Sequence, residues 1–441
     1  GKFLVKNRFY FTNLQKYMIS YTIKANGKTV KGGKMSVNVE PQGSKEITIA
    51  TSGLKSKPGT EYFIYFNVTT TEPEPLIPVG HEIAYEQFRL PIEPGERTFA
   101  TGGPALKVSA EGNELTASSS KVNFVFDKKT GLVSSYKVGG TEYFKDGFGL
   151  QPNFWRAPND NDYGNGNPKR LQVWKQSSKN FNVVDANIVM DGKDAVLTAN
   201  YLLAAGNLYI VTYRISPSGV VKADFTFTST DMEAAKTEAS EATLMATFTP
   251  GSDAARKAAS KLEVPRIGVR FRLPAEMNQV EYFGRGPEEN YIDRNAGTLI
   301  DLYKTTADQM YFPYVRPQEN GHHTDTRWLT LNKKGGKGLT IYADKTIGFN
   351  ALRNSVEDFD GEETVSRPYQ WLNRDAGELV HDENKAKDQL PRKTHINDIT
   401  PRNFVEVCVD MKQQGVAGYN SWGARPEPGY NIPANQEYKW G

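Results

Sequence analysis

Alternation of apolar and polar side chains is the dominant pattern along the chain. From Tyr17 to Lys24, large apolar residues occupy every second position, which is the period-2 signature of a strand with one buried face. Asn26-Gly27 follows as a hairpin signal, and Tyr62–Val68 is a further aromatic and β-branched run. Short strands at this spacing predict a β-sandwich of immunoglobulin type over residues 1–100.

The stretch Thr101-Gly102-Gly103-Pro104 interrupts this pattern and predicts a domain boundary, with a second domain over residues 104–441. In that domain, Tyr209–Ile215 and Val221–Phe227 alternate on either side of a Ser-Pro-Ser-Gly turn and predict an antiparallel hairpin. Helical pieces are short, such as Asp253–Leu262. Further strands are expected at Asn123–Asp127, Leu132–Val138, Ile267–Leu273, Gly338–Ala343 and Phe404–Met411. The whole pattern predicts an all-β protein whose second domain is one large antiparallel sandwich.

Length and charge narrow the class of protein. The chain has 441 residues, more than the roughly 250–300 at which a single core stops growing. A net charge of +3 from 54 basic and 51 acidic residues argues against a nucleic-acid binder. The sequence has no apolar run of about 18 residues, which argues against a membrane span. A soluble globular protein is expected.

Other sequence features leave the compartment open. The single cysteine, Cys408, excludes an internal disulfide framework and a cysteine-based zinc cluster. The first residues show no signal peptide. Both ends read as cut from something longer, so targeting signals could lie upstream.

Motifs for nucleotide, zinc-protease and serine-hydrolase chemistry are missing from the sequence. Gly335–Gly338 joins two strand-like runs and is read as a hairpin turn rather than a phosphate-binding loop. The Asn159–Asn165 loop has a carboxylate spacing similar to that of calcium loops but lacks the distal glutamate. A hydrogen-bonded turn cluster is therefore favoured over a metal site, and no metal is expected.

Two groups of titratable residues are candidates for acid–base chemistry. Glu288, Glu289 and Asp293 crowd one segment, and a retaining glycosidase needs two carboxyl groups roughly 5–5.5 Å apart. Arg285 and Arg294 lie beside them, so a structural ion-pair network is the favoured interpretation. The adjacent pair His322-His323 could supply a general acid or base. Neighbouring strand residues point in opposite directions, so one imidazole could be buried and structural while the other faces a cleft. A catalytic or ligand role for the pair is the less favoured interpretation, and the role of either histidine stays open.

Tryptophan gives the remaining chemical signal, because an indole can stack on the apolar face of a sugar. Most lone tryptophans fill cores. Trp422 differs, because Gly415, Gly418 and Gly423 surround it and Asn420-Ser421 precede it. This composition predicts an irregular projecting loop.

Long motifs give the chain a resemblance to a known family. Residues 155–162 (WRAPNDND), 282–294 (YFGRGPEENYIDR) and 311–321 (YFPYVRPQENG) strongly resemble the C-terminal part of glycoside hydrolase family 2 β-galactosidases. Residues 7–14 (NRFYFTNL) and 39–43 (VEPQG) resemble the immunoglobulin-like domain that follows the catalytic barrel of that family. The resemblance covers nearly the whole chain.

The resemblance implies an immunoglobulin-like domain followed by a large antiparallel super-sandwich, similar to galactose mutarotase. It implies that the catalytic glutamates lie on a TIM barrel upstream of this chain. No catalytic residue, cofactor or metal is therefore expected here, and the cluster at Glu288, Glu289 and Asp293 is expected to be structural.

One substrate-binding element carries over from the family. The family pattern G-G-D-[DN]-S-W is matched by Ala417–Trp422. In the family, the tryptophan of this pattern reaches the sugar pocket of the barrel. Trp422 and Asn420 are the expected substrate-binding residues. The match departs at Ala417 and Tyr419, where the family has glycine and aspartate, which leaves open whether the loop places Trp422 in the site.

The resemblance predicts part of a retaining β-galactosidase that acts on terminal β-D-galactosides. Alone, the chain should be inactive and would brace the barrel of the same polypeptide. A free-standing mutarotase or epimerase using His322 or His323 with Glu289 is one alternative. A carbohydrate-binding or assembly module is another. Association into a homo-oligomer stays open, while nucleic acid and membrane are not expected as partners.

Overall fold

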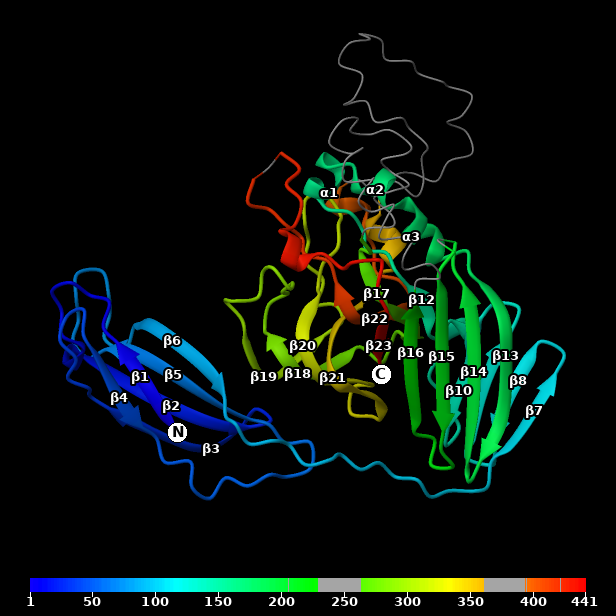
Figure 1. Cartoon of the computed structure of the whole chain (residues 1–441), viewed down its shortest axis with the longest axis horizontal. Coiled ribbons are helices and arrows are strands. Elements are labelled where there is room, and N and C mark those ends of the chain that lie inside the picture. The colour runs from blue at the N-terminus through cyan, green and yellow to red at the C-terminus, as the bar shows by residue number, and fades with distance from the viewer. Residues whose placement is uncertain (205, 229–262, 361–392, 394, 421) are drawn as a thin grey trace, which may run out of the picture. The chain divides into compact units, whose positions relative to one another are not determined.

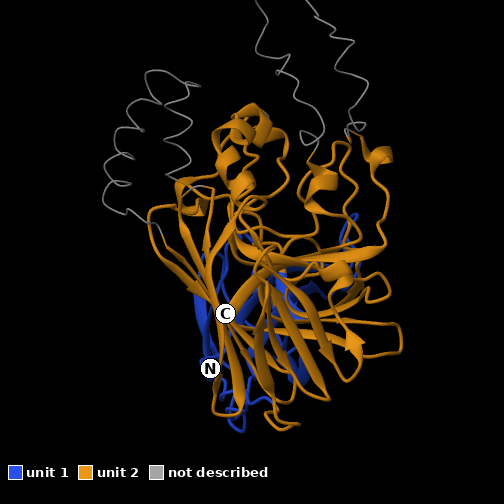
Figure 2. Cartoon of the chain, turned by 90° about the vertical axis from the view of Figure 1, so that its right-hand side faces the viewer, with its two compact units in different colours: residues 1–99, 299–302 blue, residues 100–298, 303–441 orange. Residues whose placement is uncertain are grey.

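Two compact units make up the chain, residues 1–99 with 299–302 and residues 100–298 with 303–441 (Figure 2). The structure is a computed structural model and describes residues 1–204, 206–228, 263–360, 393, 395–420 and 422–441. The expected helical piece Asp253–Leu262 lies outside the described residues. Strands predominate throughout, with antiparallel pairing between them (Figure 1). The all-β, antiparallel prediction is confirmed.

The first unit contains two sheets. A four-stranded sheet has the order β3-β2-β5-β6, and β1 pairs with β4 in the second. Ile19 and Ile23 of one sheet and Ile47 of the other share one core. The strands are β1 (Lys2–Lys6), β2 (Tyr17–Ala25), β3 (Lys28–Met35), β4 (Ser44–Thr48), β5 (Tyr62–Thr70) and β6 (Glu82–Arg89), and a short 3₁₀ helix, η1 (Leu14–Lys16), precedes β2.

The turn between β2 and β3 follows from the local sequence. Asn26 and Gly27 have φ values of 43° and 79° and join β2 to β3, as a two-residue hairpin turn with positive φ requires.

Asn7 is buried and links both stretches that resemble the immunoglobulin-like domain. Its Nδ2 donates to Val39 O at 2.9 Å, and its N–H donates to Gly43 O at 2.9 Å.

The second unit contains three sheets, except that residues 299–302, at the start of one edge strand, group with the first unit. Their strand orders are β11-β10-β9-β8-β7, β12-β17-β22-β21-β20-β18-β19 and β13-β14-β15-β16-β23. The N-terminal strands are β7 (Lys107–Glu111), β8 (Glu114–Ser118), β9 (Val122–Asp127), β10 (Leu132–Val138), β11 (Thr141–Glu142), β12 (Gln151–Asn153), β13 (Asn182–Asp191), β14 (Asp194–Leu202), β15 (Leu208–Ile215) and β16 (Val221–Thr228). The others are β17 (Arg266–Pro274), β18 (Gln279–Gly286), β19 (Leu299–Thr306), β20 (His323–Asn332), β21 (Gly338–Leu352), β22 (Phe404–Gln413) and β23 (Tyr438–Trp440).

Helices in this unit are short and lie between strands. The α-helices are α1 (Asp160–Gly164), α2 (Asn167–Arg170), α3 (Gln172–Ser177) and α6 (Val356–Phe359). The 3₁₀ helices are η2 (Lys145–Gly147), η3 (Ile396–Asp398) and η4 (Pro428–Tyr430). The Asn159–Asn165 segment, expected as a turn cluster, contains α1, because Asn159 and Asp162 form a capping box at its start.

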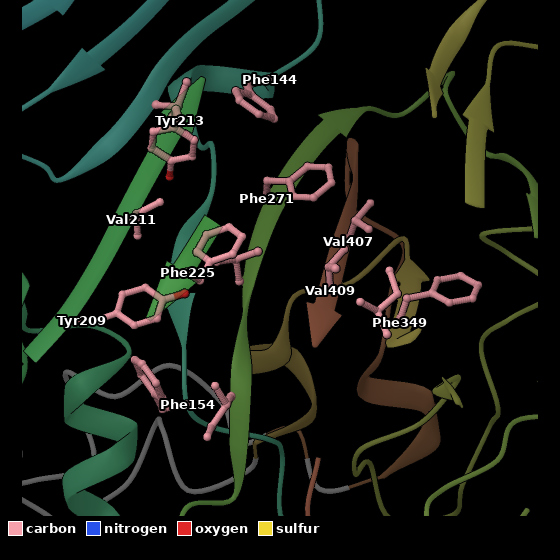
Figure 3. Close-up of a cluster of buried hydrophobic side chains, with 14 of the residues drawn as sticks. Phe144, Phe154, Tyr209, Val211, Tyr213, Phe225, Phe271, Phe349, Val407 and Val409 are labelled. Atoms are coloured by element: carbon pink, nitrogen blue, oxygen red, sulfur yellow. The ribbon is translucent and has the colours of Figure 1, made fainter. Parts of the chain in front are cut away.

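One core joins the three sheets of this unit. Along β15, Tyr209, Val211 and Tyr213 are buried and alternate with partly exposed residues. Figure 3 shows these side chains in the same apolar layer as Phe271 of β17 and Val409 of β22. Burying each large side chain contributes about 1.5–3 kcal/mol, so the core holds the sheets together and gives the loops at their ends a fixed base.

The strand predictions are confirmed at most positions. The hairpin of β15 and β16 has the register Tyr209↔Phe227. Gly335–Gly338 lies in the predicted hairpin turn, with Asn332 opposite Gly338. The strand expected at Gly338–Ala343 continues to Leu352, because polar residues at 344–346 hide its apolar continuation. The predicted limits of the two domains, and their likeness to named fold families, stay predictions.

Candidate functional site

Residues 414–420 and 422–424 follow β22 as a loop without regular secondary structure. Trp422 on this loop is 89% exposed. Asn420 is also exposed, and its Oδ1 accepts a hydrogen bond from Trp422 N at 2.9 Å. Ser421 lies outside the described residues. The loop is irregular and presents an indole to the surroundings, as the sequence predicts.

Left-handed backbone shapes this loop. Ala417, Gly418 and Gly423 have φ values of 57°, 111° and 87°. Glycine reaches such values without steric cost, whereas alanine does not. Ala417, at the position where the family has glycine, thus keeps the conformation that glycine would favour.

A buried ion pair forms the floor of the loop. Arg156 Nη2 lies 3.0 Å from Asp162 Oδ2, and the same nitrogen donates to Gly415 O at 3.1 Å. Both side chains are almost completely buried. Burial raises the pKa of Asp162, and the charge of Arg156 opposes that rise. Asn159 Nδ2 adds a hydrogen bond to Val416 O at 3.0 Å.

Helix α1 lies against the other end of the loop (Figure 1). Gly164 and Gly423 approach each other so closely that neither has space for a Cβ atom. With its amide oriented to satisfy both partners, Asn161 donates to Asn420 O at 3.1 Å and accepts from Gly418 N at 3.2 Å. The first family-like segment, residues 155–162, together with the rest of α1, therefore supports the loop from beneath.

The second family-like segment, residues 282–294, provides carboxylates with different roles. Glu289 binds Arg294 at 2.8 Å, accepts a bond from Gly321 N at 2.7 Å and also contacts the Tyr314 hydroxyl. Asp293 binds the loop backbone instead. Glu288 is exposed. The three therefore do not form one constellation, and Glu289 is engaged in a structural network.

Arg285 behaves differently from Arg294. It pairs with Asp325, on β20, at 2.5 Å. The ion-pair network expected from the sequence therefore includes only one of the two neighbouring arginines, because Arg285 points to another strand.

The third family-like segment, residues 311–321, contacts the first. The Arg316 guanidinium lies over the Tyr163 ring at 3.7 Å from its centroid, and Nη1 lies 3.4 Å from Asp160 Oδ1. Glu319 of this segment pairs with buried Arg266 at 2.9 Å. The three segments that resemble the C-terminal part of the family thus meet around the base of one loop.

Arg266 is the centre of a buried polar cluster under that base. Its Nε lies 3.2 Å from Asp410 Oδ2, and its Nη2 contacts Gln413. Burial raises the pKa of Asp410 to about 7, against the opposing charge of Arg266, and Glu319 adds to the rise. Burial also raises the pKa of Glu319. Two carboxyl groups therefore share one guanidinium, which favours the protonated form of one of them.

The histidine pair does not face a cleft. His322 and His323 are 1% and 2% exposed, which supports the structural interpretation for both and does not support the alternative in which one imidazole is accessible. His323 is held by Gly321 O and Pro287 O, 3.0 and 3.1 Å from its two ring nitrogens. Burial lowers the pKa of His322 well below its ordinary value. Packing covers both faces of the strand end where the pair lies, which alternation alone cannot reveal.

Two other tryptophans have the core role that is expected of most lone tryptophans. Trp155 and Trp174 are buried, and their indole nitrogens donate to Asp360 Oδ2 and Glu263 O, each at 2.8 Å.

Within the described ranges, the acidic, histidine and cysteine side chains form no group of three or more that could hold a metal ion. Over the same residues, helices are too short or too polar to span a bilayer.

Sequence reasoning missed several residues of the support. Arg156, Asn161 and Gly164 reach the loop only through contacts between segments about 260 residues apart in the chain. The contact between Gly164 and Gly423 has a weak signal in the sequence, since both residues are glycines next to polar segments. Their spacing in the sequence does not indicate that the two residues pack together.

Two family descriptions match the chain. Residues 118–441 match the family described as "Beta galactosidase small chain", and residues 3–91 match that described as "Beta-galactosidase, domain 4". A β-galactosidase of Priestia megaterium is 30% identical over 441 residues, which cover 99% of this chain and 37% of the relative. A β-galactosidase of Streptococcus thermophilus is 24% identical over 438 residues, covering 99% and 36%.

A shorter match occurs with the β-galactosidase of Kluyveromyces lactis, 30% identical over 272 residues, or 60% of this chain and 24% of the relative. This chain therefore spans less than two fifths of the length of these curated relatives. The family match extends over most of the second unit, including all three segments at the base of the Trp422 loop. The chain belongs to the β-galactosidase small-chain family.

Proposed function

We propose that this chain is the C-terminal part of a retaining β-galactosidase that hydrolyses terminal β-D-galactosides. In this proposal the chain braces a catalytic TIM barrel of the same polypeptide and contributes Trp422 and Asn420 to the sugar pocket. The observation that carries the proposal is the exposure of Trp422, 89%, on a loop whose base rests on buried ion pairs. The exposed indole face is available to pack against the apolar face of a sugar ring.

The chemistry proposed for Trp422 is stacking. The face of an indole packs against the apolar face of a sugar ring, and it supplies binding without transferring a proton. Such binding accelerates hydrolysis only as far as it is stronger in the transition state than in the ground state. Proton transfer and nucleophilic attack are assigned to the barrel, so this chain alone is expected to be inactive.

A carbohydrate-binding or assembly module is the second candidate, because an exposed indole also favours sugar binding without chemistry. Its test is sugar binding by this chain alone. A mutarotase using His322 or His323 with Glu289 gains no support from the geometry. Both imidazoles are buried, and Glu289 is occupied by Arg294 and Gly321 N.

The experiment compares hydrolysis of a chromogenic β-galactoside by this chain, by a separately produced catalytic barrel and by their mixture. Activity in the mixture alone supports the proposal. Activity of this chain alone would contradict it, and so would a mixture no more active than the barrel. Trp422→Ala in the mixture should lower kcat/KM by about 5- to 150-fold, which is about 1–3 kcal/mol.

A control variant distinguishes the loss of stacking on the sugar from the general effect of removing an exposed aromatic ring. Tyr342 on β21 is 40% exposed and lies far along the sequence from the loop. Tyr342→Ala should leave kcat/KM within about twofold. An equal loss in both variants would remove Trp422 from the sugar pocket.

A further inference from the structure

The Trp422 loop is held at its start by a carboxylate from a distant segment. Asp293 Oδ1 accepts a hydrogen bond from Val416 N at 3.0 Å, and Oδ2 accepts one from Ala417 N at 2.8 Å. Asp293 lies 123 and 124 residues from these amides in the sequence. Hydrogen bonds to a charged acceptor are stronger than those between neutral groups. The two bonds fix two successive peptide units.

We propose that Asp293 is a positioning residue, which sets the path of the described loop residues 415–420 and thereby the place of Trp422 at the sugar. This inference rests on the proposed function, because it assigns Asp293 a role in sugar binding through Trp422. Asp293 itself touches no sugar in this proposal.

The turn that carries Asp293 is rigidly supported. Tyr291 and Arg294 exchange two backbone hydrogen bonds of 3.2 and 2.8 Å around it. The Tyr291 ring is buried and stacks on His322, with centroids 5.6 Å apart and an angle of 19° between the planes. Arg294 is bound in turn by Glu289. The carboxylate is therefore presented from a preorganised turn rather than a mobile side chain on a free loop.

Glycine at position 415 is needed for this contact. A Cβ atom on Gly415 would lie 2.4 Å from Asp293 Oδ2 and 3.0 Å from Tyr430 Cβ. Real Cβ atoms do not approach other atoms as closely as 2.4 Å. The missing side chain thus lets the loop pass directly over the carboxylate.

The described hydrogen bonds of the carboxylate both go to the loop. Over the residues that the structure describes, Asp293 has no ion pair and no further side-chain hydrogen bond. Glu289, four residues earlier, serves the interior of the unit instead. This division of roles singles out Asp293 as the carboxylate that acts on the loop.

Amide hydrogen exchange of the 441-residue chain tests the contact itself. In Asp293→Asn, one amide oxygen remains but an NH₂ group faces the second N–H, so exchange at Val416 and Ala417 should accelerate by roughly tenfold or more. Gly415→Ala keeps the carboxylate and should act in the same direction. Asp127→Asn, which removes another carboxylate bonded to a backbone N–H, should leave both amides unchanged.

Protection of the β15 and β16 amides shows whether each variant is folded. Unchanged exchange at Val416 and Ala417 in folded Asp293→Asn would overturn the inference. If that variant does not fold, unchanged exchange in Gly415→Ala would overturn it equally.

A double-mutant cycle in the mixture of this chain with the barrel tests the link to the sugar. Asp293→Asn should raise KM by roughly 3- to 10-fold and leave kcat within about twofold. Combined with Trp422→Ala it should add nothing to the loss from Trp422→Ala alone, because both act through one indole. A chain that is only less stable would lower the active concentration without changing KM.

Additive losses in the cycle would overturn the role of Asp293 in sugar binding. If Trp422→Ala alone has no effect, the proposed function fails and this role fails with it. The exchange measurement then still decides whether Asp293 fixes the loop.

Discussion

Gly164 of α1 and Gly423 of the Trp422 loop pack backbone against backbone. A Cβ atom on Gly164 would lie 2.7 Å from Gly423 Cα, and one on Gly423 would lie 2.5 Å from the Gly164 carbonyl carbon. This contact joins α1, which begins within the first family-like segment, to the loop that presents the indole. The position of the indole therefore depends on two residues without side chains.

Gly164→Ala should displace the loop and destabilise the chain by about 1–3 kcal/mol, the usual cost of overpacking. Gly429→Ala is the matched control, because a Cβ there meets no atom within 4 Å and should change the free energy of unfolding little. Urea unfolding measures both. Equal midpoints for the two variants would contradict the contact.

Ala417→Gly should stabilise the chain by about 0.5–1 kcal/mol. Ala417 has a φ of 57°, and an L-residue with a Cβ pays about 1–2 kcal/mol in the left-handed region, part of which glycine loses again to its greater freedom when unfolded. Thermal unfolding checks the direction. Ala424→Gly, at a buried position outside the left-handed region, should instead lower stability, and a gain there would disprove the explanation.

Trp422 and Trp174 should differ sharply in their contribution to stability. Trp422 is 89% exposed and Trp174 is 1% exposed. Trp422→Ala should change the free energy of unfolding by less than about 0.5 kcal/mol, whereas Trp174→Ala should cost about 3–5 kcal/mol. Denaturant unfolding followed by far-UV circular dichroism measures both. A large cost for Trp422→Ala would mean that the loop is packed into the fold.

Asp410→Asn should change the dependence of stability on pH. Burial raises the pKa of Asp410 to about 7, above the value of about 3.9 for an unfolded aspartate. The stability that this group contributes is fully present below about pH 4 and is lost as pH rises through about 7. The wild-type chain should therefore lose on the order of 2–4 kcal/mol relative to Asp410→Asn between pH 4 and pH 8.

Urea unfolding at pH 5 and pH 8 measures this difference for Asp410→Asn. The exposed Asp185 provides the control, since Asp185→Asn should change stability little at either pH. If the advantage of Asp410→Asn did not grow with pH, the shared arrangement of Asp410 and Glu319 around Arg266 would be refuted.

The sequence predicts the strands well but does not predict which other segments pack around the strand ends. Tyr209–Ile215 alternates because one face of β15 is buried, so period and burial agree. His322 and His323 also lie at a strand end, yet both are buried, since loops and neighbouring strands cover the two sides. Alternation reports which side of a strand a residue takes, and it carries no information on what covers that side.

At the candidate site, too, one feature can be predicted from the sequence and another cannot. The exposure of Trp422 follows from local composition, because the glycines around it prevent a regular element. The bonds from Asp293 and Arg156 to the loop backbone depend on tertiary packing between distant segments. Backbone amides and carbonyls look alike in every sequence, so such partners cannot be predicted from residue types.

The long separation between Arg156 and Gly415 has a consequence for the order of folding. These residues are 259 positions apart, whereas the hairpin of β15 and β16 closes over a turn of a few residues. Loop-closure entropy makes contacts of short sequence separation form early and those of long separation late. The base that carries Trp422 should thus assemble after the local hairpins, so a refolding chain regains hairpins such as that of β15 and β16 before it regains the indole's final position.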